Sequence, residues 1–157
     1  MAGKEPEAVS HWQSNTKIDV VDREFSKYII KRDGNRCQVC GADGRMARLE
    51  NSHFWGRRME SVRFDPRNSD ALCSRCHAKF ETEKGDVAVE HDGVIIYTPR
   101  AYKAWKIKQM GQEAFDVLEL KAHTYQKKDR KLSRLIVRAL TMELDRISGP
   151  QIIGRKA

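Results

Sequence analysis

All four cysteines of the chain lie in one segment, residues 37–77, which reads CQVCGADGRMARLENSHFWGRRMESVRFDPRNSDALCSRCH. They form two Cys-x-x-Cys pairs, Cys37 with Cys40 and Cys73 with Cys76. One Cys-x-x-Cys turn presents two thiolates from a single backbone loop, and two such turns complete the tetrahedral shell that zinc prefers. The segment therefore predicts a structural zinc ion held by four cysteines.

The composition is that of a soluble, highly charged protein with a small core. Of the 157 residues, 39% are hydrophobic and 33% are charged, which suits one modest domain or a small domain with a helical extension. No stretch approaches the apolar length of a membrane span, and the N-terminal MAGKEPEAVSHW lacks an apolar signal region. We therefore expect no membrane partner and a cytoplasmic or equivalent reducing location.

Two other interpretations of the cysteines are weaker. A redox-active Cys-x-x-Cys would need only one pair, and four buried free thiols would need no matched spacing. In a reducing compartment the thiols stay reduced, and paired spacing beside histidines is typical of metal binding. The 32 residues between Cys40 and Cys73 leave room for a strand–loop–strand insert, whose two ends the zinc ion would hold together.

The net charge of +8 is unevenly distributed. Residues 1–99 carry 16 Lys/Arg and 16 Asp/Glu, whereas residues 100–157 carry 14 and 6, which is the whole excess. A basic segment beside a metal-binding module favours an anionic polymer, most simply DNA, as partner. A solvated helix surface would show the same charge, so the charge alone does not decide between the two.

Apolar periodicity, capping residues and turn residues predict a succession of short strands and helices. We expect Asp22 to cap the first helix, and Asp92-Gly93 to form the turn of a hairpin for which a loop is the alternative. The predicted elements are a helix at 22–33, strands at 46–54 and 69–73, a helix at 77–84, the hairpin or loop at 87–97, and helices at 99–111, 112–123 and 129–147. The last helix is expected to bury one apolar stripe, formed by Leu132, Leu135, Ile136, Ala139, Leu140 and Ile147.

This order of elements indicates the α+β class with a helical C-terminal extension. We expect a disordered leader at 1–20, a zinc-stapled core at 21–85, and a hairpin or loop followed by a basic helical extension at 86–157. The metal would stabilise a core that is too small to be held by apolar burial alone.

Two histidines and an asparagine accompany the cysteine pairs. His53 and Asn68 lie between the pairs, and His77 follows the last cysteine directly. A histidine between two short strands suits a general base, because its unperturbed pKa lies near neutrality. A histidine at the start of a helix can ligate a divalent cation, and Glu81, one turn further on the same face, is a second candidate ligand. Each of these residues is common by itself, so the hypothesis of a catalytic site depends on their order relative to the two cysteine pairs.

The segment from about Arg32 to Glu81, roughly a third of the chain, resembles the HNH endonuclease family, whose fold is the ββα-metal motif. The zinc-knuckle branch of that family carries Cys-x-x-Cys on both sides of its active site. The resemblance implies that His53 is the general base, Asn68 an orienting residue and His77 a ligand of a catalytic metal, which would be Mg, Mn, Zn or Ni. Glu81 stands where many members place a further histidine ligand. The stretches SHFWGRR (residues 52–58) and RFDPRNSDALCSRCH (residues 63–77) are most similar to phage-borne HNH proteins, including the recombination-linked NinG type.

The sequence departs from the family pattern at one position. Members usually have Asp or His directly before the base, as a metal ligand, where this chain has Ser52. A serine hydroxyl is a poor substitute, so Glu50, Asp65 or water would complete the metal site. The departure concerns the catalytic metal and leaves the prediction of structural zinc unchanged.

Arginines crowd the insert between the predicted base and Asn68. An arginine fork matches phosphate geometry and can stabilise negative charge that develops in a transition state. The candidate phosphate ligands of the insert are Arg57, Arg58, Arg63 and Arg67, of which we favour Arg58 and Arg63. The C-terminal helices would add sequence-independent contacts to the DNA backbone through Lys127, Lys128, Arg130, Lys131, Arg134 and Arg138.

The sequence thus predicts nicking or cleavage of DNA that depends on a divalent metal, in phage or prophage DNA processing. The main alternative is a catalytically inactive zinc-dependent DNA-binding module, with Ser52 marking the loss of the metal site. A third interpretation is a protein-interaction scaffold whose helices grip an acidic partner protein. A second copy of the chain or a phage protein is a further candidate partner.

Overall fold

The computed structural model of the chain describes residues 17–82, 89–91, 94–96 and 99–149. In this part the chain is a mixed α/β protein with two small hairpins. Its elements in chain order are α1 (Val20–Arg32), β1 (Leu49–His53), a 3-10 turn (Pro66–Asn68), β2 (Ser69–Cys73), α2 (Ser74–Thr82), β3 (Val89–His91), β4 (Val94–Ile96), α3 (Pro99–Met110), α4 (Gln112–Ala122) and α5 (Arg130–Ser148).

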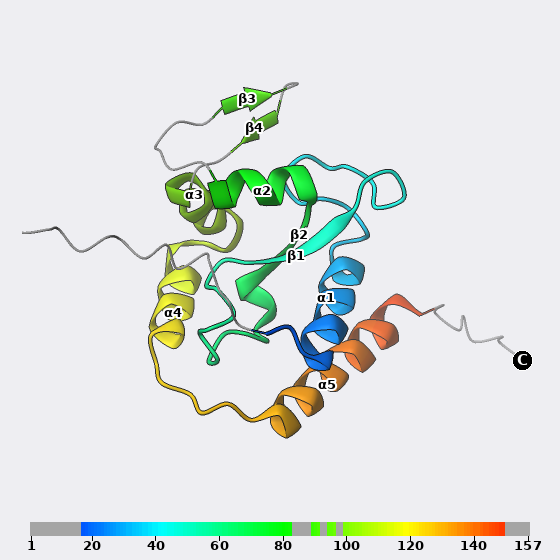
Figure 1. Cartoon of the computed structure of the whole chain (residues 1–157), viewed down its shortest axis with the longest axis vertical. Helices are drawn as coiled ribbons and strands as arrows, with labels where there is room; N and C mark the ends of the chain where they lie inside the picture. Colours follow the sequence, from blue (N-terminus) through cyan, green and yellow to red (C-terminus); the bar gives the residue numbers. More distant parts are fainter. Residues whose placement is uncertain (1–16, 83–88, 92–93, 97–98, 150–157) are drawn as a thin grey trace, which may run out of the picture.

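The hairpin of β1 and β2 lies at the centre of the molecule, with α1 on one side and α2 on the other (Figure 1). The strands pair antiparallel, with Leu49 opposite Cys73 and His53 opposite Ser69. Because successive side chains of a strand point to opposite faces, Ala71 and Leu72 enter different apolar clusters. Both faces of this hairpin are therefore covered, which fixes its register.

Each face of the hairpin has its own apolar cluster. The cluster toward α2 and α3 contains the buried side chains of Phe54, Leu72, Phe80, Tyr102 and Phe115 and also the buried cysteines. The cluster toward α1 and α5 contains the buried side chains of Val21, Phe25, Ile29, Phe64, Ala71 and Val137. The predicted helical extension therefore packs back onto the hairpin from both sides, since α3 and α4 contribute to the first cluster and α5 to the second.

Most predicted elements are confirmed within a few residues. The strand predicted at 69–73 has those bounds, and β3 pairs antiparallel with β4, as the predicted hairpin requires. Helix α2 begins at Ser74 rather than at His77, and α1 is capped by Asp19 rather than by Asp22. The predicted leader at 1–20 falls mainly on residues 1–16, which lie outside the described residues, as does the turn at 92–93.

The buried stripe predicted for α5 is wrong. Leu132, Leu135, Ile136 and Ile147 are exposed, whereas the buried positions of this helix are Ser133 and Val137. The apolar face of α5 is broad, and only one edge of it packs against α1, where Leu140 and Leu144 join the cluster. Periodicity identified the apolar face, but the packing partner decided which part of it is buried.

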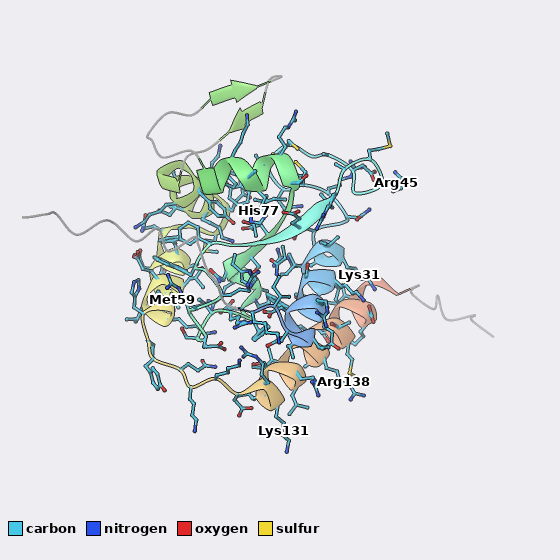
Figure 2. All side chains as sticks on the ribbon, viewed as in Figure 1. Lys31, Arg45, Met59, His77, Lys131 and Arg138 are labelled. Atoms are coloured by element: carbon cyan, nitrogen blue, oxygen red, sulfur yellow. The ribbon has the colours of Figure 1, made fainter. Side chains whose placement is uncertain are left out.

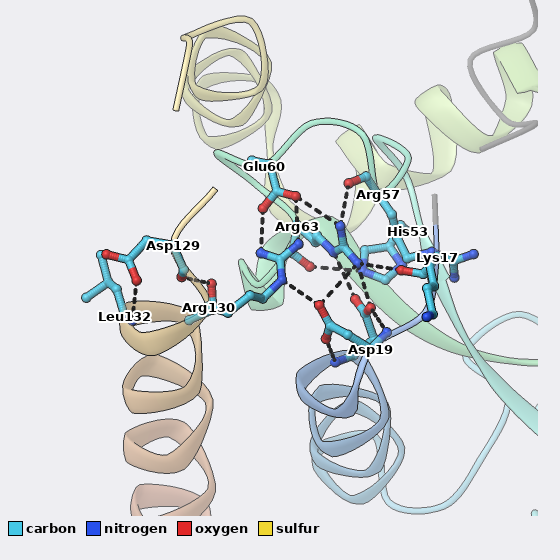
Figure 3. A network of polar contacts seen from close by, with 11 residues as sticks. Lys17, Asp19, His53, Arg57, Glu60, Arg63, Asp129, Arg130 and Leu132 are labelled. Atoms are coloured by element: carbon cyan, nitrogen blue, oxygen red, sulfur yellow. Dashed lines mark hydrogen bonds and ion pairs between the residues drawn. The ribbon is translucent and has the colours of Figure 1, made fainter. Parts of the chain in front are cut away.

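The prediction that Arg63 binds phosphate is wrong, because Arg63 is buried and its guanidinium is bound by carboxylates of the protein. The residue is 0% exposed, and its guanidinium binds Asp22 of α1 through two nitrogens, at 2.9 Å and 2.6 Å. A third nitrogen donates to Glu60 at 2.9 Å, and Glu60 is held in turn by Arg130 of α5 (Figure 3). These ion pairs tie the loop between β1 and β2 to both α1 and α5.

We expect the variant Arg63→Met to lose about 3–5 kcal/mol of unfolding free energy, because it leaves the carboxylate of Asp22 buried and unpaired. Urea unfolding followed by circular dichroism measures the loss. The double variant Arg63→Met/Asp22→Leu removes both charges, so it should recover much of the lost stability. Equal losses in the single and double variants would contradict this explanation.

Candidate functional site

The four cysteines converge at one end of the central hairpin. Their sulfur atoms all lie within 4.8 Å of one another, and the Sγ atoms of Cys40 and Cys73 are 3.7 Å apart. Cys37, Cys73 and Cys76 are buried, Cys40 is half-buried, and none is in a disulfide. The arrangement is compatible with a zinc ion bound by four thiolates, as the sequence predicts.

Backbone hydrogen bonds hold the first cysteine turn against the hairpin. The amide of Gly41, at φ 72°, donates to the carbonyl of Cys37 at 2.8 Å, which closes the turn. The amide of Gln38 donates to the carbonyl of Ala71 in β2 at 2.9 Å. The second pair needs no such bridge, because Cys73 ends β2 and Cys76 lies in the first turn of α2.

The thiols interact electrostatically as a group. The hydrogen bond from Cys76 lowers the pKa of the Cys37 thiol, and the same bond raises the pKa of Cys76. Desolvation by burial raises the pKa of Cys40. One thiolate is therefore easily formed, while further ionisation meets like-charge repulsion that a divalent cation would remove.

A second site is a pocket of about 400 Å³ between α1, β1 and the start of α2. Two of the predicted catalytic residues, His53 and His77, line it. The remaining lining residues are Ile18, Asp22, Arg23, Ser26, Arg48, Leu49, Glu50, Asn51 and Arg57. The structure thus brings together the two histidines of the predicted constellation and adds two carboxylates and three arginines.

His53 is oriented by the backbone of the loop that follows it. Its Nε2 lies 2.9 Å from the carbonyl oxygen of Arg63. A carbonyl oxygen can only accept, so Nε2 carries the proton and Nδ1 keeps a lone pair. Desolvation, opposed by the hydrogen bond to Arg63 and aided by the nearby charge of Arg57, lowers the pKa of His53 to about 4. The imidazole is therefore neutral at pH 7.

Asn68 is fully buried and fastens the loop rather than lining the pocket. Its Oδ1 accepts from the amide of Trp55 at 2.7 Å, and its Nδ2 donates to the carbonyls of Trp55 at 2.8 Å and Val62 at 3.1 Å. These bonds fix the chain on both sides of the loop that supplies the carbonyl of Arg63. They give a physical basis for the orienting role expected of Asn68.

His77 faces Glu50, with its Nδ1 2.7 Å from a carboxylate oxygen. Of the groups considered as substitutes for the missing ligand at Ser52, Glu50 is thus the one that lies in the pocket. Ser52 is buried and shares a hydrogen bond of 3.3 Å with the hydroxyl of Tyr102, while Asp65 pairs with Arg67 and Lys121. The side chain of Glu81 lies outside the described residues.

The predicted phosphate ligands are spread over the surface. Arg57 lines the pocket, Arg58 is exposed, and Arg67 pairs with Asp65 away from it. Lys127, Lys128 and Arg134 are all exposed. The sequence analysis missed Arg23, which lines the pocket from α1, and Arg48, which lines it from the position before β1.

Comparison with protein-family models, curated proteins and solved structures found no match to this chain. The cysteine cluster and the geometry of the pocket therefore carry the functional inference. Within the described parts of the chain, no helix is both long and apolar enough to cross a membrane.

Proposed function

We propose that this protein is a metal-dependent endonuclease of the HNH type that hydrolyses phosphodiester bonds in DNA. The observation that carries the proposal is the pocket in which His53 and His77 meet beside a hairpin with four clustered cysteines. The order of strand, strand and helix from β1 to α2 agrees with the motif that the sequence resembles.

His53 would act as the general base on a water molecule. Its Nδ1 is free of a proton because Nε2 donates to the carbonyl of Arg63. The low pKa keeps the base in its neutral form, ready to accept a proton, throughout the neutral range. The bonds of Asn68 to the surrounding loop would hold this carbonyl, and so the imidazole, in place.

Glu50 and His77 would hold the catalytic cation. A carboxylate oxygen and an imidazole nitrogen suit a divalent metal that keeps other positions for water and phosphate oxygens, so the residues present fit such an ion. When bound, the cation would neutralise charge on the scissile phosphate and on the leaving oxygen. The four cysteines would serve the fold, as a structural zinc site.

Arginines would position the DNA backbone. Arg23, Arg48 and Arg57 line the pocket, and the Nε of Arg57 is buried without a hydrogen-bond partner. A phosphate oxygen would satisfy that donor. The exposed side chains of Lys127, Lys128 and Arg134 would extend the contact without reading sequence.

Conversion of supercoiled plasmid to nicked and linear forms tests the proposal. We expect cleavage with added Mg²⁺ or Mn²⁺ and none without them, at unchanged zinc content. If the chain binds DNA and zinc but never cleaves with any of the four candidate metals, the inactive DNA-binding module becomes the better interpretation. DNA affinity that is weak even at low salt would favour the protein-interaction scaffold.

The variant Glu50→Gln tests the metal site directly. Loss of the carboxylate should raise the Mg²⁺ concentration for half-maximal cleavage by at least about tenfold. The matched control is Ser52→Ala. This variant changes the position at which the family usually has a metal ligand, but the serine hydroxyl that it removes bonds to Tyr102. If Ser52→Ala raised the metal requirement as much as Glu50→Gln, Glu50 would not be the ligand.

A further inference from the structure

A series of ion pairs and hydrogen bonds connects the first residue of α5 with the carbonyl that holds His53 (Figure 3). Arg130 binds the carboxylate of Glu60 through two nitrogens, each at 2.8 Å. Glu60 also accepts from Arg63 at 2.9 Å, and the carbonyl oxygen of Arg63 lies 2.9 Å from Nε2 of His53. Three contacts therefore separate helix α5 from the proposed general base.

The same arginine reaches the second carboxylate partner of Arg63 through the cap of α1. Nε of Arg130 donates to the carboxylate of Asp19. Asp19 and Asp22 cap α1 reciprocally, since the amide of each donates to the carboxylate of the other, at 2.8 Å and 3.1 Å. Asp22 in turn binds the guanidinium of Arg63. Arg130 thus holds both carboxylates that bind this guanidinium, one directly and one through the cap.

The position of the Arg63 carbonyl depends on these side-chain bonds, because this part of the loop is neither helix nor strand. The amide of Arg63 reaches only the carbonyl of Glu60, at 3.4 Å, which is long for a hydrogen bond. On one side, Asn68 holds the preceding residue by a bond of 3.1 Å to the carbonyl of Val62. The ion pairs of the guanidinium are therefore the second anchor of the carbonyl.

Arg130 differs in this respect from other basic residues of α5. Its side chain is 20% exposed, and its guanidinium lies 5.4 Å from the centre of the Phe64 ring. Lys131 and Arg138, in contrast, are exposed and lie at the edge of the molecule (Figure 2). The nitrogens of Arg130 already bind carboxylates, so this residue is poorly placed for the contact with DNA that the sequence predicts.

We propose that Arg130 is a positioning residue for His53. Through the carboxylates that it binds, it fixes the carbonyl of Arg63, which keeps the imidazole proton on Nε2 and leaves Nδ1 free to accept one. A misplacement of about 1 Å can slow an enzymatic reaction roughly 100-fold, so such an anchor affects the rate without touching the substrate. The effect on cleavage rests on the proposed function, whereas the state of the imidazole can be measured without cleavage.

NMR of the full chain labelled with nitrogen-15 tests the positioning directly, because long-range couplings show which ring nitrogen of a histidine carries the proton. At neutral pH, His53 of the wild type should be almost entirely in the form protonated at Nε2. In Arg130→Met the two neutral forms should mix, because the acceptor is no longer held in place. The matched control is Arg146→Met, which removes an exposed ion pair with Glu143 from the same helix and should keep the wild-type form of His53.

Cleavage of a short DNA duplex shows whether the positioning serves the reaction. For Arg130→Met, kcat should fall on the order of 10- to 100-fold while KM stays within about twofold, because the lost side chain contacts the loop and not the DNA. Arg146→Met should keep both constants. Glu60→Gln keeps the shape of the side chain but loses its charge, so it should show a smaller effect in the same direction. It replaces Arg130→Met in both measurements if zinc content and circular dichroism show that Arg130→Met does not fold.

The outcomes separate this inference from the proposed function. A folded variant in which His53 stays protonated at Nε2 overturns the positioning, whatever its cleavage rate. A raised KM at unchanged kcat also overturns it and returns Arg130 to the predicted contact with DNA. A wild type that never cleaves, together with mixed forms of His53 in the variant, overturns the proposed function and supports the positioning.

Discussion

The variant Cys73→Ser is expected to lose its zinc ion and, with it, the fold of the central hairpin. Cys37, Cys73 and Cys76 are buried in the same apolar cluster as Leu72 and Phe80, so the metal site and the core are one unit. A structural zinc ion contributes roughly 10–16 kcal/mol in small zinc-binding peptides, whereas a whole domain is stable by only about 5–15 kcal/mol. Loss of the ion therefore exceeds what the remaining contacts can offset.

Serine has nearly the shape of cysteine, but its hydroxyl stays protonated and does not replace a thiolate ligand. Metal analysis of the purified chain should give one zinc per wild-type molecule and much less for the variant. Far-UV circular dichroism and thermal unfolding should show loss of the cooperative transition. Ser74→Ala is the matched control, since Ser74 lies between Cys73 and Cys76 but is exposed. A zinc-free variant with the wild-type spectrum and melting temperature would show that the cysteines do not hold a structural metal.

Local patterns in the sequence predicted the elements that local chemistry determines. The cysteine spacing, the run at 69–73 and the proline at the start of α3 each depend on a few neighbouring residues, and the structure confirms the corresponding elements. Local spacing places the two cysteines of each pair together, and the preference of zinc for four ligands predicted that the two pairs meet, as the sulfur atoms within 4.8 Å of one another do. The meeting of His53 and His77 in one pocket followed from the order of strand, strand and helix.

The errors concern side chains whose environment is set by residues far away in the chain. Arg63 is buried because Asp22 lies 41 positions earlier and faces it from α1. Leu132 and Leu135 are exposed because α1, more than 100 positions earlier, packs against the neighbouring edge of α5. An arginine in a polar loop looks the same in sequence whether a carboxylate or solvent faces it, so no local signal separates the two cases.

The pH dependence of cleavage should reveal the environment of His53. A histidine with its ordinary pKa of about 6.5 would be mostly protonated at pH 5, and a reaction that needs its free base would slow roughly 30-fold from pH 7 to pH 5. Burial lowers the pKa of His53 to about 4, so the base stays unprotonated over this interval. The cleavage rate should therefore fall less than about twofold between pH 7 and pH 5 on this account. Zinc content measured at each pH distinguishes a rate that falls because His53 is protonated from a rate that falls because the protein unfolds.

The variant His53→Ala should cleave plasmid DNA about 10²–10⁴-fold more slowly than the wild type, because the other histidine that lines the pocket, His77, is engaged by Glu50. Its affinity for DNA should change little, since the lost side chain is uncharged at neutral pH. Imidazole added to the buffer should restore part of the rate by entering the space that the ring occupied, which a purely structural role would not produce. His123→Ala is the matched control, because His123 is exposed and its contacts, with the carbonyl of Glu119 and the ring of Trp55, lie outside the residues that line the pocket. Equal cleavage by both variants and the wild type would remove His53 from the mechanism and point to a base elsewhere in the pocket.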